Sequence, residues 1–378
     1  APDGLVSAMR GPRTPAIARV LMLLAAVALA AGIAGGLLRV GVLDGQLAGV
    51  SPFGAAVVAH AALMICAFFG TVIGIERAVA LGRAWAFLAP AMAAGGGVAI
   101  LLGEHGAASW CFLGAAAAFV AVNVVVVRRQ RAPHTLLLLV AALAWLAGAA
   151  LHLWRPGGPA SIESWFAFLV ITIAAERLEL TRLMPRRRGS AGILAIAIGG
   201  IVVGTGVSMF APRWGGAAYG LSLVVLAGWG LAFDIARRTI ATRGASRYMA
   251  ACLLAGYAWL ALGGLAWAAM AWGVVEARDA ALHAIGLGFV FDMVMAHALV
   301  ILPAVARIRL VYGPEFYLGF ALMQVSLALR LLGPPLGAEL RASGATLNAV
   351  AILVFALTIA GTALRARQSV PAERRYSA

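Results

Sequence analysis

The sequence predicts an all-α, polytopic membrane protein with twelve transmembrane helices, and three observations support that prediction. First, 63% of the 378 residues are hydrophobic and only 11% are charged, which excludes a soluble domain with a water-facing shell. Second, the chain divides into apolar runs near the ~20 residues that a helix needs to cross a bilayer. Third, arginines gather in every second loop between these runs. We expect a single transmembrane domain over residues 1–378.

Clusters of Gly, Pro and charged residues separate the apolar runs and set the expected helix boundaries. The first run follows basic residues, as the core of a signal peptide does, but it is longer than the ~7–15 apolar residues of such a core. We therefore expect it to be the first membrane helix. The twelve expected spans are 16–42, 53–81, 84–103, 107–127, 135–154, 162–183, 191–210, 215–236, 247–272, 279–306, 316–333 and 345–364.

The arginines test this helix count, because short cytoplasmic loops of membrane proteins hold the positive charge. With the N-terminus in the cytoplasm, most of the 29 basic residues fall in cytoplasmic loops. This pattern favours an integral protein of a bacterial inner membrane with both termini cytoplasmic, in contact with membrane lipid. It also explains the net charge of +15 without a nucleic-acid partner. The arginines expected on the opposite side are Arg39, Arg155, Arg213, Arg278, Arg330 and Arg341.

A faint internal repeat recurs every four helices. Related sequences end the second, sixth and tenth spans: GIERAVAL at 74–81, AAERLELTRL at 174–183 and AVARIRL at 304–310. An acidic and basic pair at a helix end is also a common interfacial anchor. The pattern nevertheless predicts a threefold pseudo-repeat of four-helix units.

The tenth span carries three groups that a bilayer resists: His283, Asp292 and His297. Fourteen positions separate the two histidines, which places them about 40° apart around the helix and about 21 Å apart in depth. An ionisable residue inside a membrane helix marks a functional site by default. The alternative is a histidine that hydrogen-bonds a neighbouring helix and serves packing.

Most histidines fall near the outer ends of their spans, where His60, His283 and His152 are expected. Paired imidazoles from facing helices suit a six-coordinate haem, whose apolar ring fills the space between the helices. Copper is the other metal considered, because Met64 lies one turn from His60 and Met293 one turn from His297. Ordinary apolar packing is the more common role of such methionines.

Two short segments resemble subunit I of the haem-copper oxidases. Residues 57–74, VVAHAALMICAFFGTVIG, resemble the second helix of that family, which supplies one axial ligand of the low-spin haem. His283, followed by GFVF, a Met-rich stretch and Pro303, resembles the tenth helix, which supplies the other. The resemblance implies that His60 and His283 bind the iron of a haem b. The membrane NnrS proteins, which are linked to nitric oxide metabolism, are a nearer likeness through HAIGLG (283–288) and HAALM (60–64).

Departures from the oxidases bear on the expected activity. Ala281 stands where the oxidases have the histidine of their active-site haem, and spans six and seven contain no histidine for copper. We therefore expect a b-type haem protein in redox or nitric-oxide-related physiology, without an oxygen-reducing copper and haem centre. A redox partner protein or a quinol is the expected partner. No catalytic residue is assigned, and whether the chain is an enzyme stays open.

Several alternatives remain open from the sequence. A separate depth estimate, with Arg77 and Arg307 as one level, offsets His60 from either candidate partner by roughly 10 Å, so His297 remains an alternative second ligand to His283. Position alone makes His152, Arg39 and Arg155 candidates for binding a haem propionate. The competing functions are a twelve-helix secondary transporter with Asp292 and His297 as its ion site, and a copper-handling membrane protein.

Overall fold

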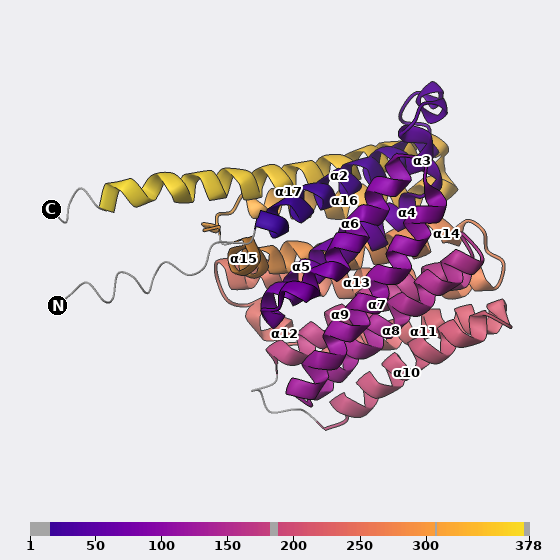
Figure 1. Cartoon of the computed structure of the whole chain (residues 1–378), viewed down its shortest axis with the longest axis horizontal. Helices are drawn as coiled ribbons and strands as arrows, with labels where there is room; N and C mark the ends of the chain where they lie inside the picture. Colours follow the sequence, from indigo (N-terminus) through magenta and orange to yellow (C-terminus); the bar gives the residue numbers. More distant parts are fainter. Residues whose placement is uncertain (1–15, 182–187, 307, 374–378) are drawn as a thin grey trace.

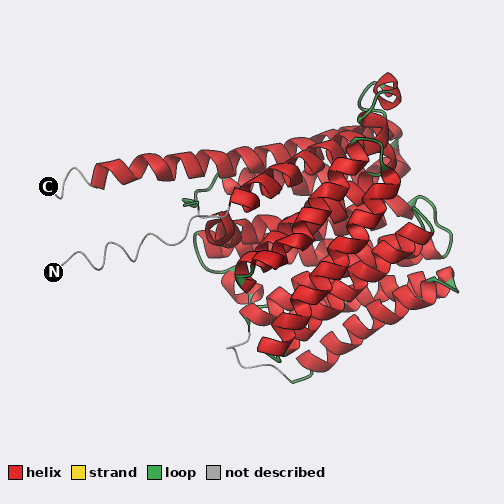
Figure 2. Ribbon diagram, in the orientation of Figure 1, coloured by secondary structure: helices red, strands yellow, loops and turns green. Residues whose placement is uncertain are grey.

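The computed structural model describes residues 16–181, 188–306 and 308–373, and within them every regular element is a helix (Figure 2). Twelve of these helices, or continuous runs of helical segments, are long and apolar enough to cross a membrane. The predicted all-α, polytopic fold with twelve spans is therefore confirmed, and the chain is an integral membrane protein.

The first half of the chain supplies six spans, and the second of them is broken into segments. Between the first and second spans lies a single turn, η1 (Gly45–Gly49). The six spans comprise α2 (Ala16–Arg39), α3 (Phe53–Val58) with α4 (His60–Ala62), η2 (Leu63–Phe69) and α5 (Gly70–Leu81), η3 (Ala84–Phe87) with α6 (Leu88–Leu101), α7 (His105–Arg129), α8 (Pro133–Trp154) and α9 (Pro159–Leu180).

The second half supplies the other six spans, and the tenth is again divided into segments. Their helices are α10 (Ser190–Ser208), α11 (Pro212–Phe233), the short α12 (Ala236–Thr239), α13 (Ala245–Ala271), α14 (Ala277–His283) with η4 (Ala284–Phe291) and α15 (Asp292–Ala306), α16 (Phe316–Leu336) and α17 (Ala338–Glu373).

Local sequence explains where several of these helices begin and end. Pro133, Pro159 and Pro212 each open a helix, at a position where the missing N–H costs nothing because it would have no intrahelical partner. Gly82 ends α5 with φ at +66°, a left-handed conformation that residues with a side chain rarely adopt. The three helices that begin with proline therefore start two or three residues before the expected positions 135, 162 and 215.

The second, sixth and tenth spans form the centre of the bundle. Buried residues make up 67%, 72% and 56% of their most apolar windows, against at most 50% in any other span. Helix α9 contacts both η2 and η4, and α5 contacts α15. The remaining spans pack around this centre, and α17 returns to contact α2 (Figure 1). These central spans are the ones with related end sequences, while a common origin of three four-helix units stays a prediction.

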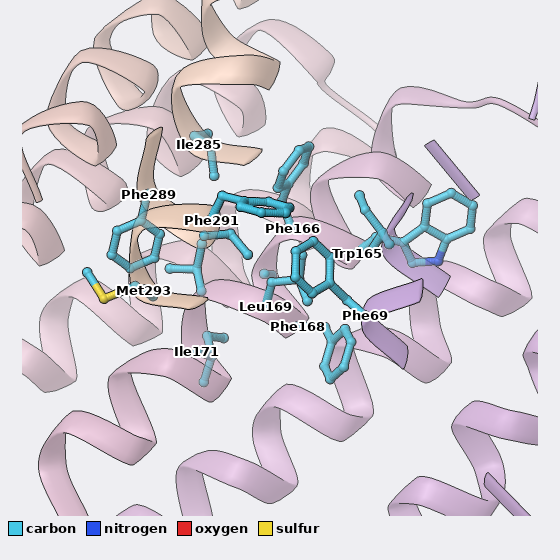
Figure 3. Close-up of a cluster of buried hydrophobic side chains, with 14 of the residues drawn as sticks. Phe69, Trp165, Phe166, Phe168, Leu169, Ile171, Ile285, Phe289, Phe291 and Met293 are labelled. Carbon is cyan, nitrogen blue, oxygen red and sulfur yellow. The ribbon is translucent and has the colours of Figure 1, made fainter. Parts of the chain in front are cut away.

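Large side chains fill the space where the three central spans meet (Figure 3). The rings of Phe69 and Phe291, from the second and tenth spans, lie 6.2 Å apart edge to face. Phe166 and Leu169 of α9 are buried beside them. This apolar core holds the side chains that contact it in place, because a close-packed interior resists displacement.

Both broken spans contain a π-helical segment next to a histidine. η2 begins three residues after His60, and η4 begins directly after His283. π-Helical turns are rare and occur frequently at functional sites, where they shift the side chains that follow. The two spans that contain the predicted haem ligands thus share an uncommon backbone feature.

The helical bundle has two ends, which differ in the residues found there. Helix α2 begins and α17 ends at the same end, on the left in Figure 1, which we call the terminal end. Segments α4 and α14, which contain His60 and His283, lie toward the other end, which we call the histidine end.

Candidate functional site

An open cavity with a volume of about 160 Å³ lies at the histidine end. Helices α2, α9, α16 and α17 and the second and tenth spans all contribute to its wall. Most of the wall is apolar, including Ile33, Ile162, Phe166 and Ile352, and its depth reaches Phe69 of the central core. The polar groups and the sulfur atom in the wall are those of His60, His283, Arg39, Arg278, Arg330, Asn348 and Met64.

His60 is oriented by a backbone carbonyl of the neighbouring helix. Its Nδ1 lies 2.7 Å from the carbonyl oxygen of Gly32 in α2. Because a carbonyl oxygen only accepts, Nδ1 carries the proton and Nε2 keeps its lone pair. Gly36 lies against the same ring, and a Cβ at that position would be 3.0 Å from Cε1 of His60. Glycine at position 36 therefore leaves the room that the imidazole occupies.

His283 is oriented by its own helix. Its Nδ1 lies 3.0 Å from the backbone oxygen of Asp279 and 3.1 Å from the carboxylate oxygen Oδ1 of the same residue. Both are acceptors, so Nδ1 carries the proton and Nε2 is the acceptor. The guanidinium of Arg330 donates to this Nε2 over 3.0 Å. His283 thus also presents a nitrogen lone pair.

The two imidazole rings lie close together in the cavity wall. Their ring centroids lie 6.4 Å apart, and their planes are inclined by 32°. Two imidazoles on opposite sides of one metal place their centroids about 6 Å apart, since each metal–nitrogen bond is about 2 Å long and each nitrogen lies about 1 Å from its ring centre. The observed separation is close to this value, and both rings have the tautomer that metal binding requires.

Guanidinium groups gather near the imidazoles. Arg39 donates to the carbonyl oxygens of Val57 and Val58 over 2.6 and 3.1 Å, where the end of α3 leaves carbonyls without helical partners. Arg330 forks onto the carboxylate of Asp279 over 3.0 and 3.1 Å. Arg278 also lines the cavity. These groups make the cavity suited to a ligand that combines an apolar body with negative charge.

Sequence reasoning assigned no site role to Asp279, Arg278, Arg330 or Asn348. The spacing of Asp279, four residues before His283 on one helix, was a readable signal. Asn348 donates to Ser326 over 2.7 Å, while its buried Oδ1 has no hydrogen-bond partner. No local signal could place Arg330 or Asn348 there, because α16 and α17 reach the cavity only through tertiary packing.

His297, the alternative second ligand, lies outside the cavity in a closed cluster. Its Nδ1 is 2.7 Å from the backbone oxygen of Met293, and its Nε2 is 3.2 Å from the guanidinium of Arg177. Arg177 forks onto Asp234 over 2.7 and 2.8 Å, and Tyr257 donates to Asp234 over 2.8 Å. Burial alone would raise the pKa of Asp234, but the hydrogen bonds and charge of Arg177 hold this pKa below its ordinary value.

The remaining predicted site residues do not line the cavity. His152 accepts a bond from the N–H of Gly157 over 3.4 Å, and its ring lies 4.9 Å from that of Trp165. Arg155 is exposed at the end of α8. Asp292, the candidate ion site of a transporter, is fully buried, and the amide nitrogen of Gln324 donates to its two carboxylate oxygens over 3.0 and 3.1 Å. The structure therefore brings together His60, His283 and Arg39 out of the predicted set.

The depth estimate made His60 and His283 too far apart. It assumed straight α-helices and used Arg307 as a reference level, and Arg307 lies outside the described residues. The π-helical segments η2 and η4, of 7 and 8 residues, have wider turns and so advance less along the axis for each residue. This effect lowers both depths by nearly the same amount, so the expected offset came mainly from the level assumed for Arg307.

Comparison with known proteins identifies the family. Residues 19–364 match a family described as a domain of unknown function (DUF8744). Neither the comparison with curated proteins nor that with solved structures finds a match. Because the match covers nearly all twelve spans, the chain belongs to the DUF8744 family.

Proposed function

We propose that this protein binds one haem b between His60 and His283 and works in redox or nitric-oxide-related physiology. The observation that carries the proposal is the 6.4 Å separation of two imidazole rings in one cavity. Each ring has its Nδ1 next to a backbone acceptor, so each Nε2 is free of a proton and can bind a metal.

The donor set favours haem over a bare metal ion. Among the described residues, no three His, Cys, Asp or Glu side chains are arranged to hold a metal. Two imidazoles alone leave most coordination positions of a metal empty, whereas a porphyrin supplies four nitrogens and needs only two axial ligands. The apolar walls of the cavity suit the ring, and the guanidinium groups suit its carboxylates.

The proposed site requires one rearrangement within the chain. Arg330 donates to the Nε2 of His283, and this lone pair is the one that a metal would take. One terminal nitrogen of its guanidinium must therefore turn from the imidazole, while its Nε can keep the 3.0 Å bond to Asp279. Arg39 and Arg278 would then pair with the propionate groups. Such charge-assisted bonds are stronger than neutral ones.

A bound haem would supply a one-electron couple. His60 and His283 would hold the haem, and the protein would exchange electrons with a redox partner protein or a quinol rather than reduce oxygen. Ala281 at the position of the active-site histidine of the oxidases supports this assignment, since alanine offers no ligand for a second haem.

A copper-handling function is the second candidate, and one residue in the cavity wall favours it. Met64 lines the same cavity as both histidines, and a thioether with two imidazoles suits Cu(I). In that case His60, His283 and Met64 would be the ligands, and the apolar volume of the cavity would have no assigned occupant.

The arginine distribution supports an orientation for the protein. We place the terminal end in the cytoplasm of a bacterial inner membrane, because most arginines were expected in the loops at that end. The histidine end would then face outward. A cytoplasm-dependent reporter fused after residue 378 should be active, and an inactive fusion with a stable product would contradict the orientation.

An absorption spectrum of the purified protein, oxidised and then reduced with dithionite, tests the haem proposal. We expect a Soret band and sharp α and β bands in the reduced form, with a haem content near one per chain. His60→Ala and His283→Ala should each remove the six-coordinate spectrum. His152→Ala is the matched control, because His152 is a histidine near the same end that does not line the cavity.

Metal analysis of the same samples separates the candidates. Iron with a porphyrin spectrum supports haem, and copper without a Soret band supports the copper site. Protein that contains neither after production in haem-replete and copper-replete cells would contradict both proposals. Equal loss of the spectrum in all three alanine variants would remove the assignment of His60 and His283.

A further inference from the structure

The Nδ1 atoms of the two imidazoles in the cavity have hydrogen-bond acceptors of unequal strength. The Nδ1 of His283 lies 3.1 Å from the carboxylate of Asp279. Arg330 forks onto this carboxylate, and Arg341 reaches it over 3.2 Å. Three helices, α14, α16 and α17, therefore fix the partner of His283. The Nδ1 of His60 has one neutral acceptor, the carbonyl of Gly32 in α2.

The backbone next to His60 also departs from helical dihedral angles at one residue. Helix α3 ends at Val58 and α4 begins at His60, and Ala59 between them has φ of −100° and ψ of 19°. This conformation belongs to the bridge region rather than to the helix. His283 lies in an unbroken run of helical backbone, and its successor Ala284 has φ of −62° and ψ of −38°. Hydrogen bonds still join the two sides of Ala59, from its N–H to the carbonyl of Ala55 over 3.0 Å and from the N–H of Leu63 to its own carbonyl over 2.9 Å. The difference between the two histidines therefore lies mainly in the acceptors of their Nδ1 atoms.

These differences predict different bonds to a metal. A carboxylate behind an imidazole fixes the ring and raises its basicity, whereas a neutral carbonyl does so less. The bond to His283 should therefore be the stronger of the two. The bond to His60 should be the one that opens, because the Nδ1 of its ring has the weaker hydrogen-bond acceptor.

We propose that His283 is the permanent axial ligand and His60 the exchangeable one, so that the reduced site binds a neutral diatomic gas, such as carbon monoxide or nitric oxide, on its His60 side. This inference rests on the proposed haem function. In the exchange the iron–Nε2 bond of His60 breaks and an iron–gas bond forms, and no electron or proton is transferred. His60 remains tied to Gly32 through its Nδ1.

Carbon monoxide titration of the reduced protein tests the inference, followed through the shift of the Soret band. His60→Ala should bind carbon monoxide about 10- to 100-fold more tightly than the wild type, the gain expected if the open state of the wild type is populated at roughly 1–10%. His283→Ala should lose haem or bind carbon monoxide more weakly than His60→Ala. The inference is overturned if the two variants have equal affinities, if the order is reversed, or if only His60→Ala loses haem.

Substitution of two glycines, one variant at a time, provides a second test in which both histidines remain in place. A Cβ at Gly36 would lie 3.0 Å from Cε1 of His60, so Gly36→Ala should push this ring and speed carbon monoxide binding several-fold. Gly286→Ala is the matched control, because its Cβ would meet only Phe166, at an ordinary 3.6 Å. Equal binding rates in these two variants would contradict the inference. A protein without any haem spectrum would instead contradict the proposed function itself.

Discussion

His283 and His297 lie in one membrane span and have nearly the same hydrogen bonds, yet they belong to different kinds of site. In each, Nδ1 lies close to the backbone oxygen of the residue four positions earlier. In each, Nε2 accepts from an arginine that forks onto an aspartate: Arg330 for His283 and Arg177 for His297. Local bonding therefore does not distinguish a ligand from a structural histidine.

The surroundings of the two histidines do distinguish them. The side chains of Arg177 and Asp234 are 4% and 1% exposed, and Tyr257 and the N–H of Ala236 complete the bonds of the carboxylate. We call this group the closed cluster. His283 instead faces a cavity that also contains a second imidazole. An intramembrane histidine is a strong candidate ligand where it adjoins both open volume and another donor.

The largest expected effect comes from breaking the closed cluster. Arg177→Met would leave Asp234 buried without its cation, and loss of one partner of a buried pair costs about 3–5 kcal/mol of stability. The measurement is reversible unfolding in detergent by denaturant. The haem spectrum of the folded fraction should stay unchanged, because the closed cluster does not line the cavity.

Arg155→Met is the matched control, since Arg155 is exposed at the end of α8. Substitution of an exposed residue away from such networks changes stability by about 0.5 kcal/mol or less. If Arg177→Met proved as stable as Arg155→Met, the closed cluster would have no structural role and His297 would again be a candidate ligand.

A smaller effect is expected from substitution of Asp279, the aspartate that accepts from Arg330 beside the cavity. Asp279→Asn removes the carboxylate behind His283 and should weaken cofactor binding about 10- to 100-fold. Haem transfer to an excess of a haem-binding acceptor protein measures this affinity through its rate and extent. Glu276→Gln, an exposed carboxylate near the start of the same span, should retain the cofactor as the wild type does. Identical retention by both variants would argue against a supporting role for Asp279.

Much of the fold was predictable because hydropathy and arginine position act along the chain. Each span is nearly continuous in apolar residues, so length alone located it. The π-helical segments η2 and η4 were not predictable, because their residues are as apolar as those of an α-helix and the shift in hydrogen bonding leaves no pattern. The spacing of Asp279 from His283 was readable, as one helix face determines it.

The rest of the site depends on contacts between distant spans. Arg330 and Asn348 reach the cavity from α16 and α17, and no periodicity encodes that approach. His152 and Arg155 were selected by depth alone, and depth does not determine the direction around a helix axis. His60 and His283 were selected by resemblance and by their places near the outer ends of their spans, against the separate depth estimate, and the structure places their rings side by side. Whether they bind iron stays a prediction.

The smallest expected effect is a loss of stability at acidic pH, caused by protonation of Asp234 in the closed cluster. Because the pKa of Asp234 is lower in the folded protein than in an ordinary carboxyl, its contribution to stability is complete above the unfolded value of about 4. This contribution is lost as the pH falls through the folded value. Asp234→Asn should be less stable at neutral pH and lose less stability than the wild type on acidification. Unfolding curves between pH 7 and pH 3 measure both slopes, and parallel curves would show that the carboxylate of Asp234 is not stabilised by the closed cluster.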